Sequence, residues 1–239
     1  AIAVNGLGAE NVIGVAMPSQ FSSDHSISDA EILAKNLGIN FHTIPIKQIN
    51  AQFLDDLGSI FSDTEPGLAE ENLQARIRGD LLMAIANKKD ALLLNTGNKT
   101  ESALGYCTMY GDMCGALAVI SDLNKSQVYS VCHWINENHG KEIIPEGTLS
   151  KPPSAELSPN QVDPFDYDVV SPLVDAIVTD DLHLKGLAKA GFDPELSIEI
   201  LQKVRYSEYK RRQAAPGLRI SKKAFGIGRR YPIVNAYKE

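Results

Sequence analysis

The stretch "DALLLNTGNKTE", residues 90–101, sets an apolar run directly before a polar cluster. Its consecutive aliphatic residues are typical of a strand that is buried on both faces of a parallel sheet. Such sheets bind their ligands beyond the carboxyl ends of the strands. We therefore expect residues 90–97 to form a strand, and Thr96, Lys99 and Glu101 to lie exposed at its carboxyl end.

Strand and helix signals alternate along the rest of the chain. Residues 11–18 and 39–46 are rich in β-branched residues and predict two further strands. A helix between them is expected to begin at a capping box of Ser28 and Glu31 and to stop at Gly38. This alternation predicts an α/β fold in which a mostly parallel sheet is doubly wound, with helices on both faces.

The second half of the chain is predicted to be largely helical. Further helices are expected from about Gln48, from Pro66 to Asn87 with Asp63 or Thr64 as the cap, around 124–138, and after Ser171, Asp180 and Asp193. Residues 145–168 form a long irregular loop, and loops of that length in compact domains are functional lids or disordered.

Composition excludes several classes of protein. The chain has 239 residues, of which 44% are hydrophobic and 22% charged, as expected for one globular domain. Its longest apolar runs are far shorter than the roughly 20 residues that span a bilayer, and no secretory signal is recognisable. The three cysteines form no C-x-x-C pair, and the five histidines lack zinc-site spacing. We expect a reduced, cytoplasmic protein without a membrane partner.

Charge is distributed unevenly. Residues 203–239 hold 11 Lys and Arg against 2 Asp and Glu, whereas residues 1–202 hold 12 against 28, for a net charge of −7. The basic segment has few interleaved aromatic residues, so a nucleic-acid partner is not expected. The phosphates of a small ligand, or water alone around a solvated terminus, explain the pattern equally well.

Five stretches, spread over nearly the whole chain, carry a resemblance to a known family. They are "MPSQFSSDHS" (17–26), "EENLQARIRG" (70–79), "NTGNKTESALGYCTMYGD" (95–112) with "LNKSQVY" (123–129), "KPPSAEL" (151–157), and "EYKRRQAAPGL" (208–218) with "RRYPIVN" (229–235). In this order they resemble the synthetase domain of the NAD synthetase family, and the last stretch resembles its glutamine-dependent members. The resemblance implies an adenine nucleotide α-hydrolase-like fold.

The resemblance also implies a reaction. ATP adenylates the carboxylate of nicotinic acid adenine dinucleotide (deamido-NAD), pyrophosphate leaves, and ammonia, free or derived from glutamine, displaces AMP to give NAD. Such chemistry needs neutralised phosphates, a divalent cation such as Mg²⁺ and a site that excludes water. A homodimer or larger homo-oligomer is implied as well.

The resemblance implies ATP-binding roles for the residues at matching positions. Thr96 and Ser154 resemble ATP-binding hydroxyls. Lys125 and Lys151 resemble catalytic lysines that face phosphates. Glu101 offers the hard oxygen ligand that Mg²⁺ prefers. Simpler interpretations remain: a turn-stabilising hydroxyl for Thr96, solvated lysines, and a helix-start carboxylate favoured by the dipole for Glu101.

A second set of residues is expected to bind deamido-NAD. Asn72 and Arg76 lie four residues apart, so they share one face of a helix, as the matching pair does in the family. Asp112 resembles an aspartate near the nicotinate end, and Lys210 resembles a lysine that closes over the substrate. Glu101 belongs to this set too. Without the motif, Arg76 would be read as part of a solvated helix edge.

One family motif has no counterpart in this sequence. The S-G-G-x-D-S loop cradles pyrophosphate with its N–H groups, whereas "GLG" (6–8) and "GIG" (226–228) lack its Ser and Asp. We therefore expect residues 1–239 to be an N-terminally incomplete NAD synthetase domain, without the first strand, the phosphate loop or a glutaminase domain. One alternative is a non-catalytic nucleotide-binding or assembly module. A related ATP pyrophosphatase such as a GMP synthetase is another, although "EENLQARIRG" and "KPPSAEL" argue against it.

Overall fold

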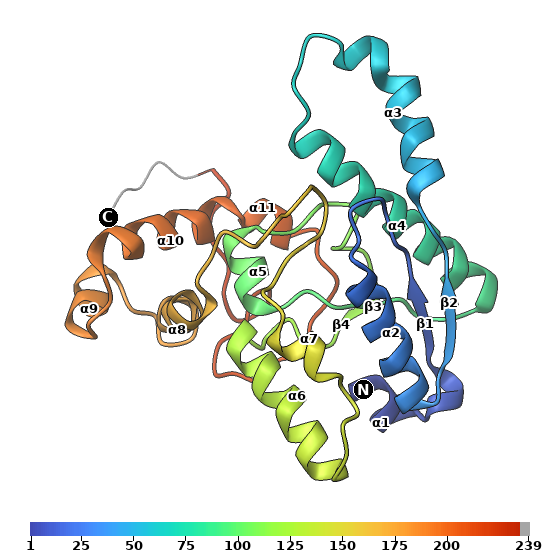
Figure 1. Ribbon diagram of the computed structural model, residues 1–239. Coiled ribbons are helices and arrows are strands. Elements are labelled where there is room, and N and C mark those ends of the chain that lie inside the picture. The colour runs from blue at the N-terminus through green and yellow to red at the C-terminus, as the bar shows by residue number, and fades with distance from the viewer. Residues whose placement is uncertain (235–239) are drawn as a thin grey trace. The chain divides into compact units, whose positions relative to one another are not determined.

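A computed structural model describes residues 1–234 of the 239-residue chain (Figure 1). Asn235, the last residue of the stretch "RRYPIVN", lies outside the described residues. The chain divides into two compact units, and each is described here by itself. The first unit holds Ala1–Leu82 and Tyr129–Pro164, and the second unit holds Met83–Val128 and the chain from Phe165 onward.

The first unit is built around two parallel strands. Its elements are α1 (Ile2–Leu7), a 3-10 turn (Ala9–Asn11), β1 (Ile13–Ala16), α2 (Asp24–Leu37), β2 (Asn40–Thr43), α3 (Lys47–Phe61), most of α4 (Leu68–Lys89), most of α6 (Lys125–His139), and α7 (Glu146–Ser150). Strand β1 runs parallel to β2, in a register that places Ile13 opposite Asn40. Figure 1 shows the two strands side by side, with α2 connecting them. Both predicted strands are thus confirmed.

Helix α2 begins earlier than the sequence predicted. The Ser23 hydroxyl caps it by accepting a hydrogen bond from the Ser26 N–H, so the predicted capping box of Ser28 and Glu31 is wrong. The predicted stop is confirmed: Gly38 adopts a left-handed conformation with φ 68°. Glycine reaches that region without the steric cost that a Cβ atom imposes.

Helix α4 also begins differently from the prediction. It starts at Leu68, and its amino end is satisfied by the Glu70 carboxylate, which accepts a hydrogen bond of 2.7 Å from the Gly67 N–H. The Thr64 hydroxyl instead donates to the Phe61 carbonyl at the end of α3. Neither Asp63 nor Thr64 therefore caps α4.

The first unit has a small apolar core between α2 and α6. Ile135, Ile143 and Ile144 are buried, and partly buried hydrophobic residues such as Leu33 pack against them. The Asn136 side chain fixes the turn after α6, because its Oδ1 accepts from the N–H groups of both Ile143 and Ile144. A buried turn needs such partners for its backbone groups.

The second unit combines a short parallel sheet with a larger helical core. Its elements include β3 (Leu94–Asn95), α5 (Lys99–Leu104), β4 (Leu117–Ala118), α8 (Tyr167–Val178), α9 (Leu184–Lys189), α10 (Pro194–Tyr206) and α11 (Glu208–Arg211). Strand β3 runs parallel to β4, and Ala118 of β4 also forms a parallel bridge with Gly217. The predicted strand at 90–97 is only two residues long, and the polar cluster that follows it contains the start of α5. Parallel strands and many helices confirm the α/β fold class.

The core of the second unit centres on α8. Leu173 and Val174 are fully buried there, together with residues of α5, α9 and α10. Asp166 caps α8, so the prediction that this helix starts after Ser171 is wrong. Likewise, α9 begins at Leu184 with His183 as its cap residue, not after Asp180. The predicted cap of α10, Asp193 followed by Pro194, is confirmed. Across residues 1–234, no helix combines the length and apolar character that a membrane span requires.

Candidate functional site

Each unit holds a cluster of polar side chains from the predicted site. In the second unit, the cluster begins at the amino end of α5. Asn98 caps the helix with its Oδ1, which accepts a hydrogen bond from the Glu101 N–H at 3.0 Å. In return, Glu101 Oε2 accepts from the Asn98 N–H at 3.1 Å. This reciprocal capping box gives Glu101 the helix-start role of the simpler interpretation.

The other carboxylate oxygen of Glu101 faces a lysine. Lys125 Nζ lies 3.0 Å from Glu101 Oε1, and each side chain is about one-fifth exposed (20% and 21%). Lys125 is the first residue of α6, and its N–H donates to Thr100 Oγ1 at 3.1 Å. Its ammonium also lies 5.2 Å from the centre of the Tyr167 ring, within the range of a cation–π interaction. The expected metal ligand and an expected phosphate-binding lysine are thus in contact.

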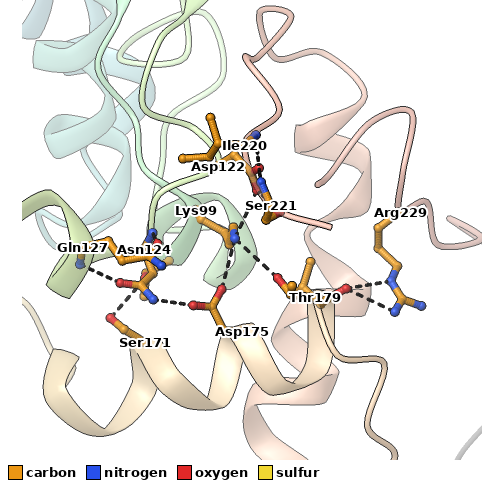
Figure 2. A network of polar contacts seen from close by, with 12 residues as sticks. Lys99, Asp122, Asn124, Gln127, Ser171, Asp175, Thr179, Ile220, Ser221 and Arg229 are labelled. Atoms are coloured by element: carbon orange, nitrogen blue, oxygen red, sulfur yellow. Dashed lines mark hydrogen bonds and ion pairs between the residues drawn. The ribbon is translucent and has the colours of Figure 1, made fainter. Parts of the chain in front are cut away.

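Lys99 is not exposed at the end of the sheet, contrary to the prediction. It is only 1% exposed, and Figure 2 shows its ammonium between side chains of α8 and the loop before α6. The Nζ atom lies 3.0 Å from Asp175 and 3.1 Å from Asp122. Asn124, just before Lys125, donates to the other oxygen of Asp175 at 2.5 Å. A buried ammonium with these partners holds the start of α5 and the start of α6 together.

Asp122 extends this network to the carboxyl-terminal segment (Figure 2). Its Oδ2 accepts from the N–H groups of Ile220 and Ser221, and its Oδ1 accepts from the Ser221 hydroxyl. Desolvation raises the pKa of Asp122, but these donors and Lys99 outweigh it, so the pKa lies below its usual value. The carboxylate therefore stays charged and keeps its hydrogen bonds to Ile220 and Ser221 of the carboxyl-terminal segment.

The loop around Asp112 lies between β3 and β4 in sequence. Asn95, at the end of β3, donates to the Asp112 carbonyl at 2.7 Å, and the Thr108 N–H donates to Asp112 Oδ1 at 2.7 Å. Although the residue keeps an exposed face, desolvation and the nearby Glu101 carboxylate raise the pKa of Asp112 to about 6, against the opposing effect of the Thr108 hydrogen bond. Asp112 thus changes charge near pH 6.

Lys210 is fastened to backbone groups. Its ammonium donates to the carbonyls of Gly105 and Cys107 at 2.7 Å each, just past the carboxyl end of α5. A lysine there satisfies carbonyls that the helix leaves unpaired. Its neighbour Arg211 is buried in an ion pair with Glu208. Thr96 is exposed directly after β3.

In the first unit, the cluster lies at the amino end of α2. Lys151 Nζ contacts the hydroxyls of Ser23 and Ser26 at 2.9 and 2.6 Å. Its ion-pair partner is Glu156, from the same loop. Arg78 of α4 donates through Nε to the Met17 carbonyl at 3.0 Å, and its charge interacts favourably with Glu156. Cations, hydroxyls and a helix start are the groups that proteins use to bind phosphate.

The loop that carries Lys151 is held by several further contacts. The Ser154 hydroxyl donates to the Gln161 carbonyl at 2.5 Å and accepts from the Glu156 N–H at 3.1 Å. Gln74, buried on α4, donates to the Leu157 carbonyl at 2.8 Å. The Gln74 Oε1 atom has no hydrogen-bond partner among residues 1–234, which leaves a buried acceptor. The loop is therefore held by contacts of its own residues and by one from α4.

Asn72 and Arg76 lie on α4, both partly buried. Their spacing places them on one face of that helix, as expected from the sequence. Within the described part of the chain, no group of three or more His, Cys, Asp or Glu side chains is arranged to hold a metal ion.

Sequence reasoning missed three members of the first-unit cluster, Ser23, Ser26 and Glu156. The signal was present, since both serines lie in the hydroxyl-rich stretch "MPSQFSSDHS" and the glutamate in "KPPSAEL". What the sequence lacks is their proximity: Ser26 Oγ donates to Glu156 Oε1 at 2.9 Å across 130 residues of chain.

Comparison with known proteins identifies the family. A family model described as NAD synthase matches residues 1–214. The glutamine-dependent NAD(+) synthetase of Synechocystis sp. is 54% identical over 240 residues, which cover 99% of this chain and 43% of that protein. The structure of glutamine-dependent NAD+ synthetase from Acinetobacter baumannii in complex with adenosine diphosphate is 39% identical, with a TM-score of 0.63 over 99% of this chain and 43% of that one.

A likeness in fold extends further. The glutamine-dependent NAD(+) synthetase of Cytophaga hutchinsonii superimposes with a TM-score of 0.77 at 20% identity, over 94% of this chain and 38% of that one. The chain spans less than half the length of the curated relatives that it matches. Since the family model covers most of the sequence, the chain belongs to the NAD synthase family.

Proposed function

We propose that this chain is the synthetase part of an NAD synthetase that uses ATP to amidate deamido-NAD. The nicotinate carboxylate attacks the α-phosphate of ATP, and pyrophosphate leaves. Ammonia, free or released from glutamine, then attacks the carbonyl carbon of the acyl-adenylate and displaces AMP. The observation that carries this proposal is the 54% identity to a glutamine-dependent NAD(+) synthetase along 99% of the chain.

In the second unit, we assign Glu101 and Lys125 to ATP. Both oxygens of Glu101 already have donors, the Asn98 N–H and the Lys125 ammonium, so Lys125 Nζ stands where a cation would stand. Bound Mg²⁺ would neutralise phosphate charge. A magnesium–ATP complex offers Glu101 a cation and Lys125 an anion, so the pair can separate without leaving either charge unpaired. Thr96, which is exposed directly after β3, is assigned to ATP as a hydrogen-bond donor.

In the first unit, we assign Lys151 and Ser154 to phosphate groups. Lys151 is about one-third exposed (34%) beside the hydroxyls of Ser23 and Ser26, at the start of the 14-residue helix α2. The positive end of that helix and the ammonium both favour phosphate oxygens. Both residues lie on the long loop for which the sequence left open a functional lid or disorder.

We assign five residues to deamido-NAD: Asn72, Arg76, Glu101, Asp112 and Lys210. Asn72 and Arg76 share a face of α4, and a guanidinium can bind phosphate through two hydrogen bonds. Lys210 would release the carbonyls of Gly105 and Cys107 as it reaches substrate. A cytoplasmic homo-oligomer belongs to the same proposal.

A non-catalytic module is the alternative, and the relatives do not favour it, since they are named as synthetases. The test is an assay of the protein expressed from its complete gene, with ATP, Mg²⁺, deamido-NAD and either ammonium or glutamine. We expect NAD, AMP and pyrophosphate in equal amounts. Amidation of xanthosine monophosphate in place of deamido-NAD, or formation of ADP and phosphate, would contradict the proposal.

A further inference from the structure

The first-unit cluster already holds an anion, and that anion is the chain's own Glu156. Its Oε1 accepts hydrogen bonds from the hydroxyls of Ser23 and Ser26, at 2.9 Å each, and contacts the Lys151 ammonium. Its Oε2 accepts from the Ser23 N–H at 3.2 Å. We call Ser23, Ser26 and Lys151 the anion cage. Every one of these contacts is made to a carboxylate oxygen.

The donors of the anion cage suit a phosphate as well as a carboxylate. Two hydroxyls, an ammonium and a backbone N–H supply charge-assisted hydrogen bonds to any oxyanion of suitable size. The guanidinium of Arg78 adds a favourable charge interaction with the group in the cage. Desolvation raises the pKa of Glu156, but the hydrogen bonds from Lys151, Ser26 and Ser23 outweigh it and hold the pKa below its usual value. The carboxylate is therefore charged at neutral pH and competes as an anion.

Glu156 lies in the loop that follows α7. Lys151 and Glu156 are five residues apart, so the loop brings a cation and the anion that neutralises it to the same place. Glu156 adopts a left-handed backbone conformation, with φ 49°, which non-glycine residues rarely occupy. Loss of its cage contacts would leave Glu156 free to move with the loop.

We propose that Glu156 is an internal competitor for phosphate: it occupies the anion cage when no ligand is bound, and a phosphate group of the substrate must displace it. This inference rests on the proposed function, which assigns Lys151 to phosphate. The phosphate comes from ATP or from the pyrophosphate bridge of deamido-NAD, and both present the same oxygens. Glu156 thereby raises the phosphate concentration that is needed to fill half of the anion cages.

The direction of the expected effect distinguishes competition from structural support. A cage that is competent to bind for only one-tenth of the time weakens apparent affinity roughly tenfold. Removal of the competitor should therefore tighten phosphate binding, whereas removal of a merely structural contact should weaken it or leave it unchanged. In the protein expressed from its complete gene, titration calorimetry with pyrophosphate should give a dissociation constant roughly tenfold lower for Glu156→Gln than for wild type.

Two matched variants distinguish the effect of occupying the anion cage from the effect of changing the protein's net charge. Glu146→Gln removes the same charge from an exposed position on α7 and should leave pyrophosphate binding unchanged. Glu156→Asp keeps the charge but shortens the side chain by one methylene, so it should also bind pyrophosphate more tightly than wild type. The proposal is overturned if Glu156→Gln binds no more tightly than wild type, if neither protein binds pyrophosphate, or if Glu156→Asp matches wild type.

A measurement on wild type guards against a variant that fails to fold. With ¹³C-labelled glutamate side chains, addition of pyrophosphate should shift the Glu156 carboxyl signal, and an unmoved signal at saturation contradicts displacement. Steady-state kinetics identifies the source of the phosphate. If Glu156→Gln lowers the KM for only one of the two substrates, ATP or deamido-NAD, that substrate is the one that competes with Glu156. If Glu156→Gln binds pyrophosphate more tightly than wild type but wild type forms no NAD, this inference stands and the proposed function is refuted.

Discussion

The ammonium of Lys125 lies 3.0 Å from Oε1 of Glu101, and the two residues belong to the first turns of two different helices. Neither residue is fully buried, so the pair can open without a large desolvation cost. Opening provides a carboxylate for a divalent cation and an ammonium for phosphate at one place. The proposed binding of magnesium–ATP in the second unit depends on this relationship.

The first prediction concerns the charge of Glu101. Glu101→Gln keeps the capping box, since glutamine also serves at that position, but it removes the charge that would hold Mg²⁺. We expect AMP and pyrophosphate release to fall by about 100-fold at low Mg²⁺, since each 1.4 kcal/mol lost corresponds to a factor of about 10. The rate should partly recover at high Mg²⁺. The measurement is the initial rate across a series of Mg²⁺ concentrations.

The folded state should be little affected by Glu101→Gln. A partly exposed ion pair contributes about 0 to 1 kcal/mol to stability, so the melting temperature should move by only a few degrees. Glu137→Gln, an exposed change on α6, serves as the matched control and should leave rate and Mg²⁺ dependence intact. Normal Mg²⁺ dependence in Glu101→Gln would restrict Glu101 to its role at the helix start.

The second prediction concerns the buried ammonium of Lys99. Lys99→Met preserves volume but leaves Asp122, which is 3% exposed, without its ion-pair partner. An uncompensated buried charge costs about 3 to 5 kcal/mol. Urea unfolding at pH 7 should show a loss of this size, whereas Lys185→Met on the exposed side of α9 should change stability by less than about 0.5 kcal/mol. A loss below about 1 kcal/mol for Lys99→Met would contradict the network shown in Figure 2.

The third prediction is a pH dependence that arises from Asp112. Its folded-state pKa is raised to about 6, above the usual value near 3.8, so the folded state disfavours the carboxylate. This group should therefore add stability as the pH falls from 7 through 6 toward 4. Asp112→Asn removes the titration, so its stability advantage over wild type should shrink over that range. Unfolding free energies at several pH values measure this, and a difference between Asp112→Asn and wild type that stays constant from pH 7 to 4 would contradict it.

The fourth prediction concerns the loop at residues 151–163. Its contacts to the anion cage depend on the charge of Glu156, and a hydrogen bond to a charged group contributes about 1.5 to 3 kcal/mol. Limited proteolysis of Glu156→Gln without ligand should therefore cleave this loop about tenfold faster than in wild type. Magnesium–ATP should protect the loop in both proteins, because Lys151 and Ser154 then bind phosphate. Equal cleavage with and without ATP would argue against a lid.

Local signals in the sequence predicted much of the fold. Gly38 ends α2 and Asp193 with Pro194 begins α10, because these conformational preferences act within one turn of helix. Both strands of the first unit also lie within their predicted ranges. Helix starts were predicted less well where several capping residues compete. Ser23 caps α2 rather than Ser28, and Ser23 also contacts the distant Glu156.

In the candidate site too, the sequence predicted individual residues but not the contacts between distant parts of the chain. The sequence predicted Glu101 and Lys125 as site residues, but their contact joins residues 24 positions apart and depends on the tertiary fold. Lys99 was predicted to be exposed at the sheet end because its partners, Asp122 and Asp175, lie far along the chain. Burial of a lysine can be inferred only when its compensating carboxylates are known.

The central claim is that the carboxylate of deamido-NAD is activated by adenylation before ammonia attacks. Deamido-NAD labelled with ¹⁸O in its nicotinate carboxylate tests this directly, in the protein expressed from its complete gene with ATP, Mg²⁺ and ammonium. One carboxylate oxygen should bridge to the α-phosphate and leave with AMP. Mass spectrometry should therefore find one ¹⁸O in AMP and none in pyrophosphate. Label in inorganic phosphate, or unlabelled AMP beside newly formed NAD, would contradict the account.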